Sequence, residues 1–113
     1  MKGIVWCTNL PDGNKMLEEI INKYKYSGID LIDYKIRYFS SSATFNNGDN
    51  WRVCKANENA RHARCNIAYI QRNIPYNIYR TIIEPTIVAY PFSGIHLWGE
   101  GNLYITNEIQ RPF

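Results

Sequence analysis

The change from a short apolar run to helical spacing, near the start of the chain, constrains the fold most strongly. Residues 2–8 are mainly apolar and rich in β-branched and aromatic side chains, which predicts a buried strand. The turn-forming sequence Asn9-Leu-Pro-Asp-Gly13 ends this strand, and Asn14 is expected to cap a helix. Because an amphipathic helix must bury its apolar stripe, this pair of segments indicates a helix packed on a sheet.

The helix is predicted over residues 14–27. Its apolar side chains recur at helical spacing, at Met16, Leu17, Ile20, Ile21 and Tyr24. The remaining positions are mainly charged or polar, so the opposite face suits solvent. Gly28 follows, and glycine readily adopts the left-handed conformation with which many helices end.

Shorter segments predict further strands. Residues 32–38 alternate strictly, which predicts a half-buried strand with Ile32, Tyr34, Ile36 and Tyr38 on its covered face. A second helix is expected from Pro75 to the residue before Pro85. The other strands are expected at 43–45, 50–55, 66–70, 86–90, 95–98 and 103–106, the last two forming a closing hairpin.

These segments predict an α/β fold with a single mixed sheet of about eight strands and two helices, in the order β-α-β-β-β-β-α-β-β-β. The sheet is expected to be partly parallel, near Lys2, Asn66 and Thr86. The chain has 113 residues, of which 45% are apolar. That is enough for one domain, residues 1–113, with a substantial core.

Membrane insertion and secretion are not expected. The longest uninterrupted apolar run has four residues, whereas a membrane span needs about 20. The sequence Met1–Thr8 lacks the apolar core and the cleavage site of a signal peptide. Three cysteines, an odd count, indicate free thiols in a reducing compartment, so a cytoplasmic location is expected.

The loop between the first strand and the first helix invites comparison with a phosphate-binding P-loop. Thr8 stands where that motif requires its first glycine, and Asn14 separates Gly13 from Lys15. Without these glycines the backbone N–H groups cannot wrap around a phosphate. We therefore expect no nucleoside triphosphate at this loop.

Cysteine and histidine side chains are the candidates for metal binding and nucleophilic catalysis. Cys7, Cys54, His62 and Cys65 lack the paired C-x2–4-C spacing of structural zinc sites. Cys65 near His62 is the one candidate for a nucleophile with its base, without a recognisable third residue to orient the imidazole. We assign no metal, cofactor or catalytic residue, and a thiol enzyme remains an alternative.

Positive charge is concentrated in the middle of the chain, although the net charge of the whole chain is only +3. Arginine and lysine are the residues that phosphate contacts require. A structural role, with the arginines bonding carbonyl groups at strand ends, is equally compatible with this pattern. The predicted contacts to nucleic acid or an acidic partner are Arg52, Lys55, Arg61, Arg64 and Arg72.

Aromatic residues are frequent, and nine of them are tyrosines. Many fall in predicted strands, where core packing is the default. Tyrosine and tryptophan are also enriched in protein interfaces. The predicted interface residues are Tyr76, Trp98 and Tyr104.

Three stretches between residues 43 and 72 carry a resemblance to a known family. They read Ala-Thr-Phe-Asn-Asn-Gly-Asp-Asn-Trp-Arg-Val-Cys from residue 43, Asn-Ala-Arg-His-Ala-Arg from residue 59, and Asn-Ile-Ala-Tyr-Ile-Gln-Arg from residue 66. This pattern resembles the middle of the RecA-like ATPase core of phage terminase large subunits. In that family an F-x-N-G hairpin precedes an Arg-Gly turn and a buried strand that ends in the Asp-Glu pair called Walker B.

The chain departs from that family at the residues that carry ATPase chemistry. The Walker A strand and loop would lie before residue 1, and Gln71 and Arg72 occupy the Walker B positions. Glutamine carries no negative charge to hold Mg²⁺, and arginine reverses the sign that a base requires. The resemblance therefore implies a remnant of a motor domain that does not hydrolyse ATP.

These observations lead to one expected function and two alternatives. The abundance of Ile, Asn and Tyr indicates an AT-rich coding sequence, as in low-GC bacteria, their phages and plasmids. We expect a non-catalytic phage or mobile-element accessory protein, located in the host cytoplasm, that binds a host or phage protein such as a nucleic-acid enzyme or a defence factor. The alternatives are direct binding of DNA or RNA through the basic loop and a thiol enzyme. Self-association through the edges of the final hairpin remains open.

Overall fold

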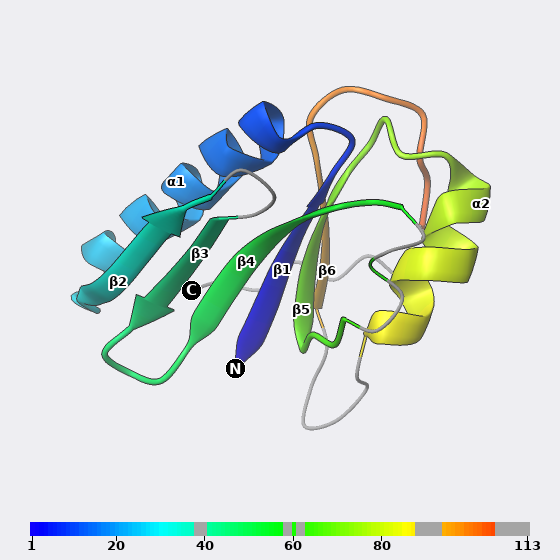
Figure 1. The fold of residues 1–113 in the computed structure, drawn as a ribbon. Coiled ribbons are helices and arrows are strands. Elements are labelled where there is room, and N and C mark those ends of the chain that lie inside the picture. Colours follow the sequence, from blue (N-terminus) through cyan, green and yellow to red (C-terminus); the bar gives the residue numbers. More distant parts are fainter. Residues whose placement is uncertain (38–40, 58–59, 61–62, 88–93, 106–113) are drawn as a thin grey trace.

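The chain forms a sheet with the strand order β2-β3-β4-β1-β5-β6 and with helical segments on both faces (Figure 1). The computed structural model describes residues 1–37, 41–57, 60, 63–87 and 94–105. The strands are β1 (Lys2–Cys7), β2 (Leu31–Ile36), β3 (Ser41–Phe45), β4 (Asn50–Lys55), β5 (Ile67–Gln71) and β6 (Gly94–Trp98). The helical segments are α1 (Leu10–Tyr26), α2 (Tyr76–Ile78), η2 (Tyr79–Ile83) and η3 (Glu84–Thr86).

The sheet is mixed. Strands β4, β1, β5 and β6 run parallel to one another. Strands β2 and β3 extend the sheet beyond β4 through antiparallel pairs. The predicted α/β class with a single, partly parallel sheet is therefore confirmed. Among the described residues, no helix has both the length and the apolar character that a membrane crossing requires.

Strand β1 lies in the middle of the sheet and is buried on both faces. It pairs with β4 on one side and with β5 on the other. Val5 and Cys7 belong to the core under α1, whereas Ile4 and Trp6 belong to the core on the opposite face. This double burial explains why β1 is an almost unbroken apolar run, as predicted.

Helix α1 packs on β1, β3 and β4 with the face predicted from its spacing. Tyr24 near its end stacks on Phe45 of β3, with 3.9 Å between the ring centroids. The Tyr24 hydroxyl accepts a hydrogen bond from Trp51 Nε1 at 2.8 Å and donates one to Asp49 at 2.8 Å. These contacts tie α1 to the β3–β4 hairpin. The buried apolar residues of the helix are Met16, Leu17, Ile20 and Tyr24.

The predicted start of this helix is wrong, because α1 begins at Leu10 rather than at Asn14. Asn9 is the N-cap, and its side chain accepts a hydrogen bond from the Asp12 N–H at 3.0 Å. Pro11 suits the first turn of a helix, where its missing N–H is not needed. Gly13, read from the sequence as part of a turn, instead lies in the helix. The predicted ending is confirmed, since Gly28 has a φ of +78° just after the helix.

Strand β2 differs from its predicted half-buried form. It spans Leu31–Ile36 at an edge of the sheet, and Ile32 and Ile36 are 65% and 66% exposed. Only Tyr34 is partly buried, beside the core under α1. Alternation indicates that one face of a strand is apolar, but the neighbour that should cover this face is set by the topology. Tyr38, the fourth residue of the predicted face, lies outside the described residues.

The second helical segment extends from Tyr76 to Thr86, through α2, the π-helical η2 and the 3-10 helix η3. Pro85 does not end it, because the proline occupies the first turn of η3. Of the strand predicted at 86–90, Thr86 is helical and Ile87 forms an isolated bridge with Cys65, while 88–90 lie outside the described residues. The helical segment buries Tyr79, Ile82 and Ile83 against the sheet, and Ile78 is partly buried.

The predicted closing hairpin is wrong. Strand β6 pairs with β5 in parallel, and residues 103–105 form no strand. Instead the Leu103 N–H donates to the Arg72 carbonyl oxygen at 3.0 Å. Leu103 and Ile105 are buried on either side of the exposed Tyr104, which imitates the alternation of a strand. The described sheet thus has six strands instead of about eight.

We predict that Gly13→Ala destabilises the protein. A Cβ atom at Gly13 would lie 2.5 Å from Val53 Cγ1 and 2.7 Å from Cys7 Sγ, so α1 would have to move away from β1 and β4. Overpacking of this kind costs about 1–3 kcal/mol, only partly offset by the better helix propensity of alanine. Chemical denaturation measures the loss. Asn22→Ala, at an exposed position of the same helix, is the control and should change the free energy of unfolding by less than about 0.5 kcal/mol. A fully stable Gly13→Ala protein would contradict the close packing of α1.

Candidate functional site

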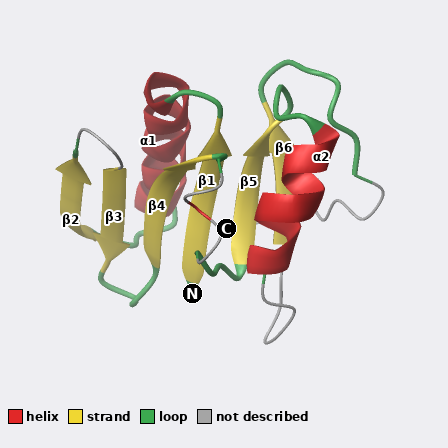
Figure 2. Cartoon of the chain, turned by 45° about the vertical axis from the view of Figure 1, so that its right-hand side comes forward, coloured by secondary structure: helices red, strands yellow, loops and turns green. Residues whose placement is uncertain are grey.

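The candidate site lies where the parallel strands β1, β5 and β6 end. Helix α1 follows β1 on one face of the sheet, and α2 follows β5 on the other (Figure 2). The chain therefore leaves these two neighbouring strands in opposite directions. In open α/β sheets, ligands bind in the crevice that such a reversal opens at the carboxyl ends of the strands.

Four polar side chains fill the centre of this crevice and form what we call the switch-point cluster: Thr8, Asp12, Gln71 and Asn73. The side-chain oxygen Oε1 of Gln71 accepts hydrogen bonds from the Thr8 N–H at 2.9 Å and from the Thr8 hydroxyl at 3.2 Å. The Gln71 amide nitrogen donates to Asp12 Oδ2 at 3.0 Å, and Asn73 Nδ2 donates to Thr8 Oγ1 at 3.1 Å. Hydrogen bonds from Asn9 and Gln71 lower the pKa of Asp12. These bonds link the residues that follow β1 to Gln71, the last residue of β5.

An open pocket of about 580 Å³ lies beside the switch-point cluster. Its charged groups have both signs, because Lys15 stands among Asp12, Glu19 and Glu100. Within the part of the chain that the structure describes, no three His, Cys, Asp or Glu side chains are placed to hold a metal ion. Gln71, which lines the pocket, is 5% exposed and its side chain is engaged with Thr8 and Asp12.

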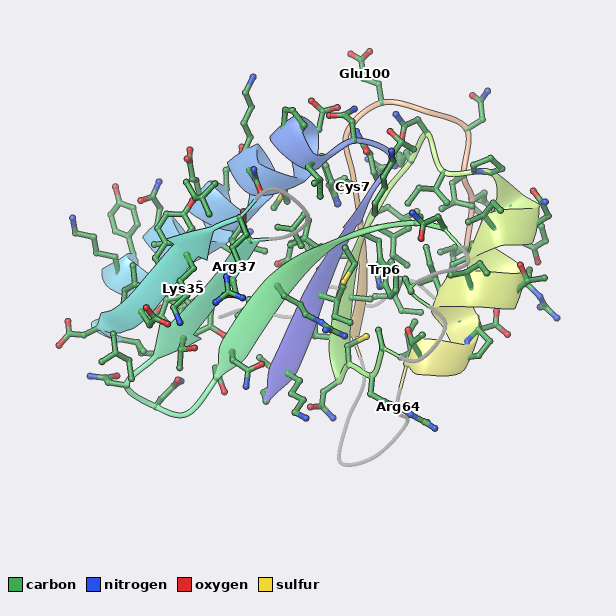
Figure 3. The ribbon with its side chains drawn as sticks, viewed as in Figure 1. Trp6, Cys7, Lys35, Arg37, Arg64 and Glu100 are labelled. Atoms are coloured by element: carbon green, nitrogen blue, oxygen red, sulfur yellow. The ribbon has the colours of Figure 1, made fainter. Side chains whose placement is uncertain are left out.

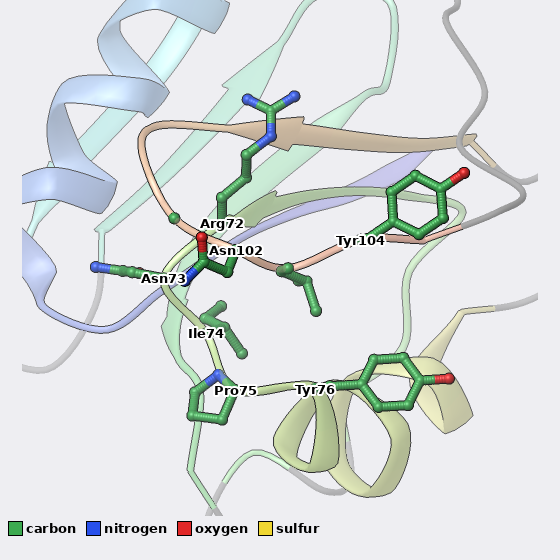
Figure 4. A pocket seen from close by; sticks show the side chains of 9 residues that line it. Arg72, Asn73, Ile74, Pro75, Tyr76, Asn102 and Tyr104 are labelled. Carbon is green, nitrogen blue, oxygen red and sulfur yellow. The ribbon is translucent and has the colours of Figure 1, made fainter.

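A second pocket of about 600 Å³ lies on the other side of the segment that follows β5. Its apolar floor contains the buried side chains of Ile74 and Leu103. Tyr76 and Tyr104 border it, and Figure 4 shows their rings on the same side of the pocket, with Arg72 pointing away from them. We call this surface the tyrosine groove, formed by Ile74, Pro75, Tyr76, Leu103 and Tyr104.

Backbone hydrogen bonds hold the tyrosine groove in shape. The Arg72 N–H donates to the Trp98 carbonyl at 2.9 Å, and the Arg72 carbonyl accepts from the Leu103 N–H. The Arg72 guanidinium donates to the Gly99 carbonyl at 3.2 Å. Glycine is required at position 101, between Gly99 and Leu103, because a side chain there would overlap the Arg72 carbonyl. The two edges of the groove are therefore joined through one residue.

The structure brings together some of the predicted interface residues. Tyr76 and Tyr104, 56% and 74% exposed, border the same groove, and Arg72 lines it as well. Trp98 lies elsewhere, partly buried against the core under α1 and facing the first pocket. Sequence reasoning missed Ile74 and Leu103, whose apolar character alone indicates core rather than the floor of a groove.

The predicted basic residues that the structure describes lie at separate positions on the sheet. Arg64 precedes β5 and Arg72 follows it, so these two arginines lie at opposite ends of one strand. Arg52 is exposed in the middle of β4, and Lys55 is exposed at its end. Figure 3 shows Arg64 well apart from Lys35 and Arg37 of the β2 region. Arg61 and His62 lie outside the described residues.

One basic residue that the sequence reasoning missed lies in line with Arg52. Lys35 of β2 pairs with Ser42 of β3, which pairs with Arg52 of β4. Lys35 also forms an ion pair with Asp33, with 3.5 Å between Nζ and Oδ2. Alternation placed Lys35 on the outer face of its strand, but only the order of the strands shows that it shares a row with Arg52.

Burial disfavours the thiolate form of all three cysteines. Cys7 and Cys65 are buried, and Cys54 is partly buried. Burial raises the pKa of Cys65 to about 11 and that of Cys7 to about 12. Because the thiolate is the nucleophile, thiols with such pKa values react slowly.

Comparison with known proteins adds no relative. No family model matches the chain, and no curated protein and no solved structure matches it. Fold and site geometry are therefore the basis for the functional proposal.

We predict slow alkylation of the native protein by iodoacetamide at pH 8, at least about tenfold slower than in denaturant. The native rate should continue to rise above pH 9, towards the pKa of about 11 of Cys65. Because burial raises the pKa of Cys65, this thiol loses its proton at a lower pH in the unfolded state than in the folded state. The folded protein should therefore lose stability as the pH rises from 9 towards 11. Mass spectrometry counts the modified cysteines. Rapid native modification of Cys65 at pH 7 would instead favour the thiol-enzyme alternative.

Proposed function

We propose that this protein acts without catalysis, by binding a protein partner through the tyrosine groove. The observation that carries this proposal is the pair of exposed tyrosines, Tyr76 and Tyr104, on one apolar groove. They are distant in sequence, yet the bonds of Arg72 hold their segments together. Two exposed aromatic rings beside an apolar floor are the kind of anchor on which protein interfaces depend.

The energetics of the groove support binding of a protein segment. Tyrosine offers a large contact area and loses little conformational entropy when it binds, because only two side-chain torsions must be fixed. Ile74 and Leu103 are already packed in the core, so the floor needs no rearrangement. The groove is open rather than enclosed, which suits a side chain or loop of another protein better than a small molecule.

The biological setting of the proposal comes from the sequence. Its composition and its resemblance to a motor core without Walker motifs suit an accessory protein of a phage or mobile element. Gln71 strengthens the non-catalytic part of the proposal, since its side chain is engaged with Thr8 and Asp12. A host or phage protein that acts on nucleic acid, or a defence factor, is the partner class we propose.

We predict that replacing both tyrosines weakens partner capture by at least about tenfold. Tagged protein would be incubated with nuclease-treated lysate of a low-GC bacterium, and retained proteins identified by mass spectrometry. Tyr76→Ala with Tyr104→Ala should lose a partner that the parent protein retains at moderate salt. Tyr26→Ala, which removes an even more exposed tyrosine (94%) from the end of α1, should retain it. Equal retention by the groove variant and the parent would contradict the proposal.

Direct binding of nucleic acid is the second candidate, and one observation favours it. Lys35 and Arg52 lie in one row across β2, β3 and β4, and both are exposed. If the protein binds nucleic acid, the tagged protein should recover DNA or RNA from a lysate that has not been treated with nuclease, and the recovery should fall steeply as the salt concentration rises. Arg52→Ala would then reduce recovery, and the tyrosine variants would not.

A further inference from the structure

Strand β2 presents an open edge. It is the last strand of the sheet on its side, and no strand among the described residues pairs with its outer edge. Ile32 and Ile36 are largely exposed on it. An edge strand with free N–H and C=O groups and apolar side chains is a template for pairing with another strand.

The charges on β2 do not protect this edge against a second copy of itself. A lysine on an edge strand usually prevents pairing, because it would be brought close to the same lysine of another molecule. Here Asp33 and Lys35 lie two residues apart and therefore on the same face of the strand, 3.5 Å from each other. An antiparallel partner with the same sequence offers the opposite charge at each position.

We propose that β2 pairs antiparallel with β2 of a second copy, about a two-fold axis through Tyr34, to make one continuous sheet. In this register Asp33 of each copy lies opposite Lys35 of the other. Two ion pairs thus form across the interface from residues that the single chain leaves half exposed. Ile36 of one copy comes opposite Ile32 of the other, which removes apolar surface from water at both ends of the strand.

The charge pattern favours this register over its neighbours. A shift by two residues in one direction puts Asp33 opposite Asp33. A shift in the other direction puts Asp33 opposite Arg37 at both ends with Lys35 opposite Lys35 between them, so the central lysine pair is what disfavours that register. Directly opposed like charges are destabilising across strands. The irregularity between Leu31 and Asp33 falls at Ile32. It lies outside the Asp33–Lys35 segment that determines the register, but it includes one residue of the Ile32–Ile36 pair.

Pairing at β2 would leave the tyrosine groove free. The groove follows β5 and β6, at the opposite end of the strand order from β2. The dimer would therefore carry two grooves, which, if the proposed function holds, makes it a bivalent binder. The dimer itself does not depend on that function, because its test measures only mass.

Charge-reversal substitutions at Asp33 and Lys35 test the proposal directly. Asp33→Lys should place lysines opposite lysines, and Lys35→Asp should place aspartates opposite aspartates. The dimer of each variant alone should have a dissociation constant at least about tenfold higher than that of the parent dimer. Mixed in equal amounts, the two variants should form a heterodimer, because every pair across the interface is then of opposite charge. Analytical ultracentrifugation from about 5 to about 200 µM measures the mass, and native mass spectrometry identifies the heterodimer.

Each result decides for or against the proposal. Circular dichroism establishes that both variants fold, as expected for substitutions at exposed positions. Glu100→Lys, a charge reversal at the exposed turn after β6, should leave dimerisation unchanged. A parent protein that stays monomeric at all concentrations would overturn the proposal. So would a dimer that both charge variants preserve, or a mixture of folded variants that remains monomeric.

Discussion

The sheet is organised around β1, which is buried on both of its faces. Its alternate residues belong to two separate cores, with Val5 and Cys7 under α1 and Ile4 and Trp6 on the other face. Both cores need a cover, so α1 must pack on one side and the segment from α2 to η3 on the other. The chain then leaves β1 and β5 in opposite directions, which opens the crevice at their carboxyl ends. The position of the candidate site thus follows from the core.

Local periodicity predicted the parts of the fold that depend on local burial. The apolar face of α1, the unbroken run of β1 and the buried residues of η2 could all be read from spacing. The spacing of apolar residues does not show which element packs on an apolar face, or which residue accepts a given backbone hydrogen bond. For this reason β2 was expected to be half buried, although α1 does not cover Ile36. Residues 103–105 read as a strand, although Leu103 is bonded to the distant Arg72.

The candidate site could be predicted only residue by residue. Tyr76 and Tyr104 were selected for their type, but the contact that joins their segments runs through Arg72 and requires the parallel pairing of β5 with β6. For the basic residues, closeness in sequence does not mean closeness in space. Arg64 and Arg72 are near each other in the sequence, but strand β5 lies between them, so they stand at opposite ends of that strand. Gln71 is a third case. Its lack of charge is evident from the sequence, whereas its bonds to Thr8 and Asp12 depend on the pairing of β1 with β5.

We propose that partners bind at the tyrosine groove. Hydrogen–deuterium exchange, compared between the free protein and the protein saturated with its captured partner, tests this claim most directly. Binding at the groove should slow exchange in residues 72–76 and 101–105, which carry the groove, with little change in β2, β3 and β4. Protection concentrated on β2 to β4, with exchange at the groove unchanged, would contradict it.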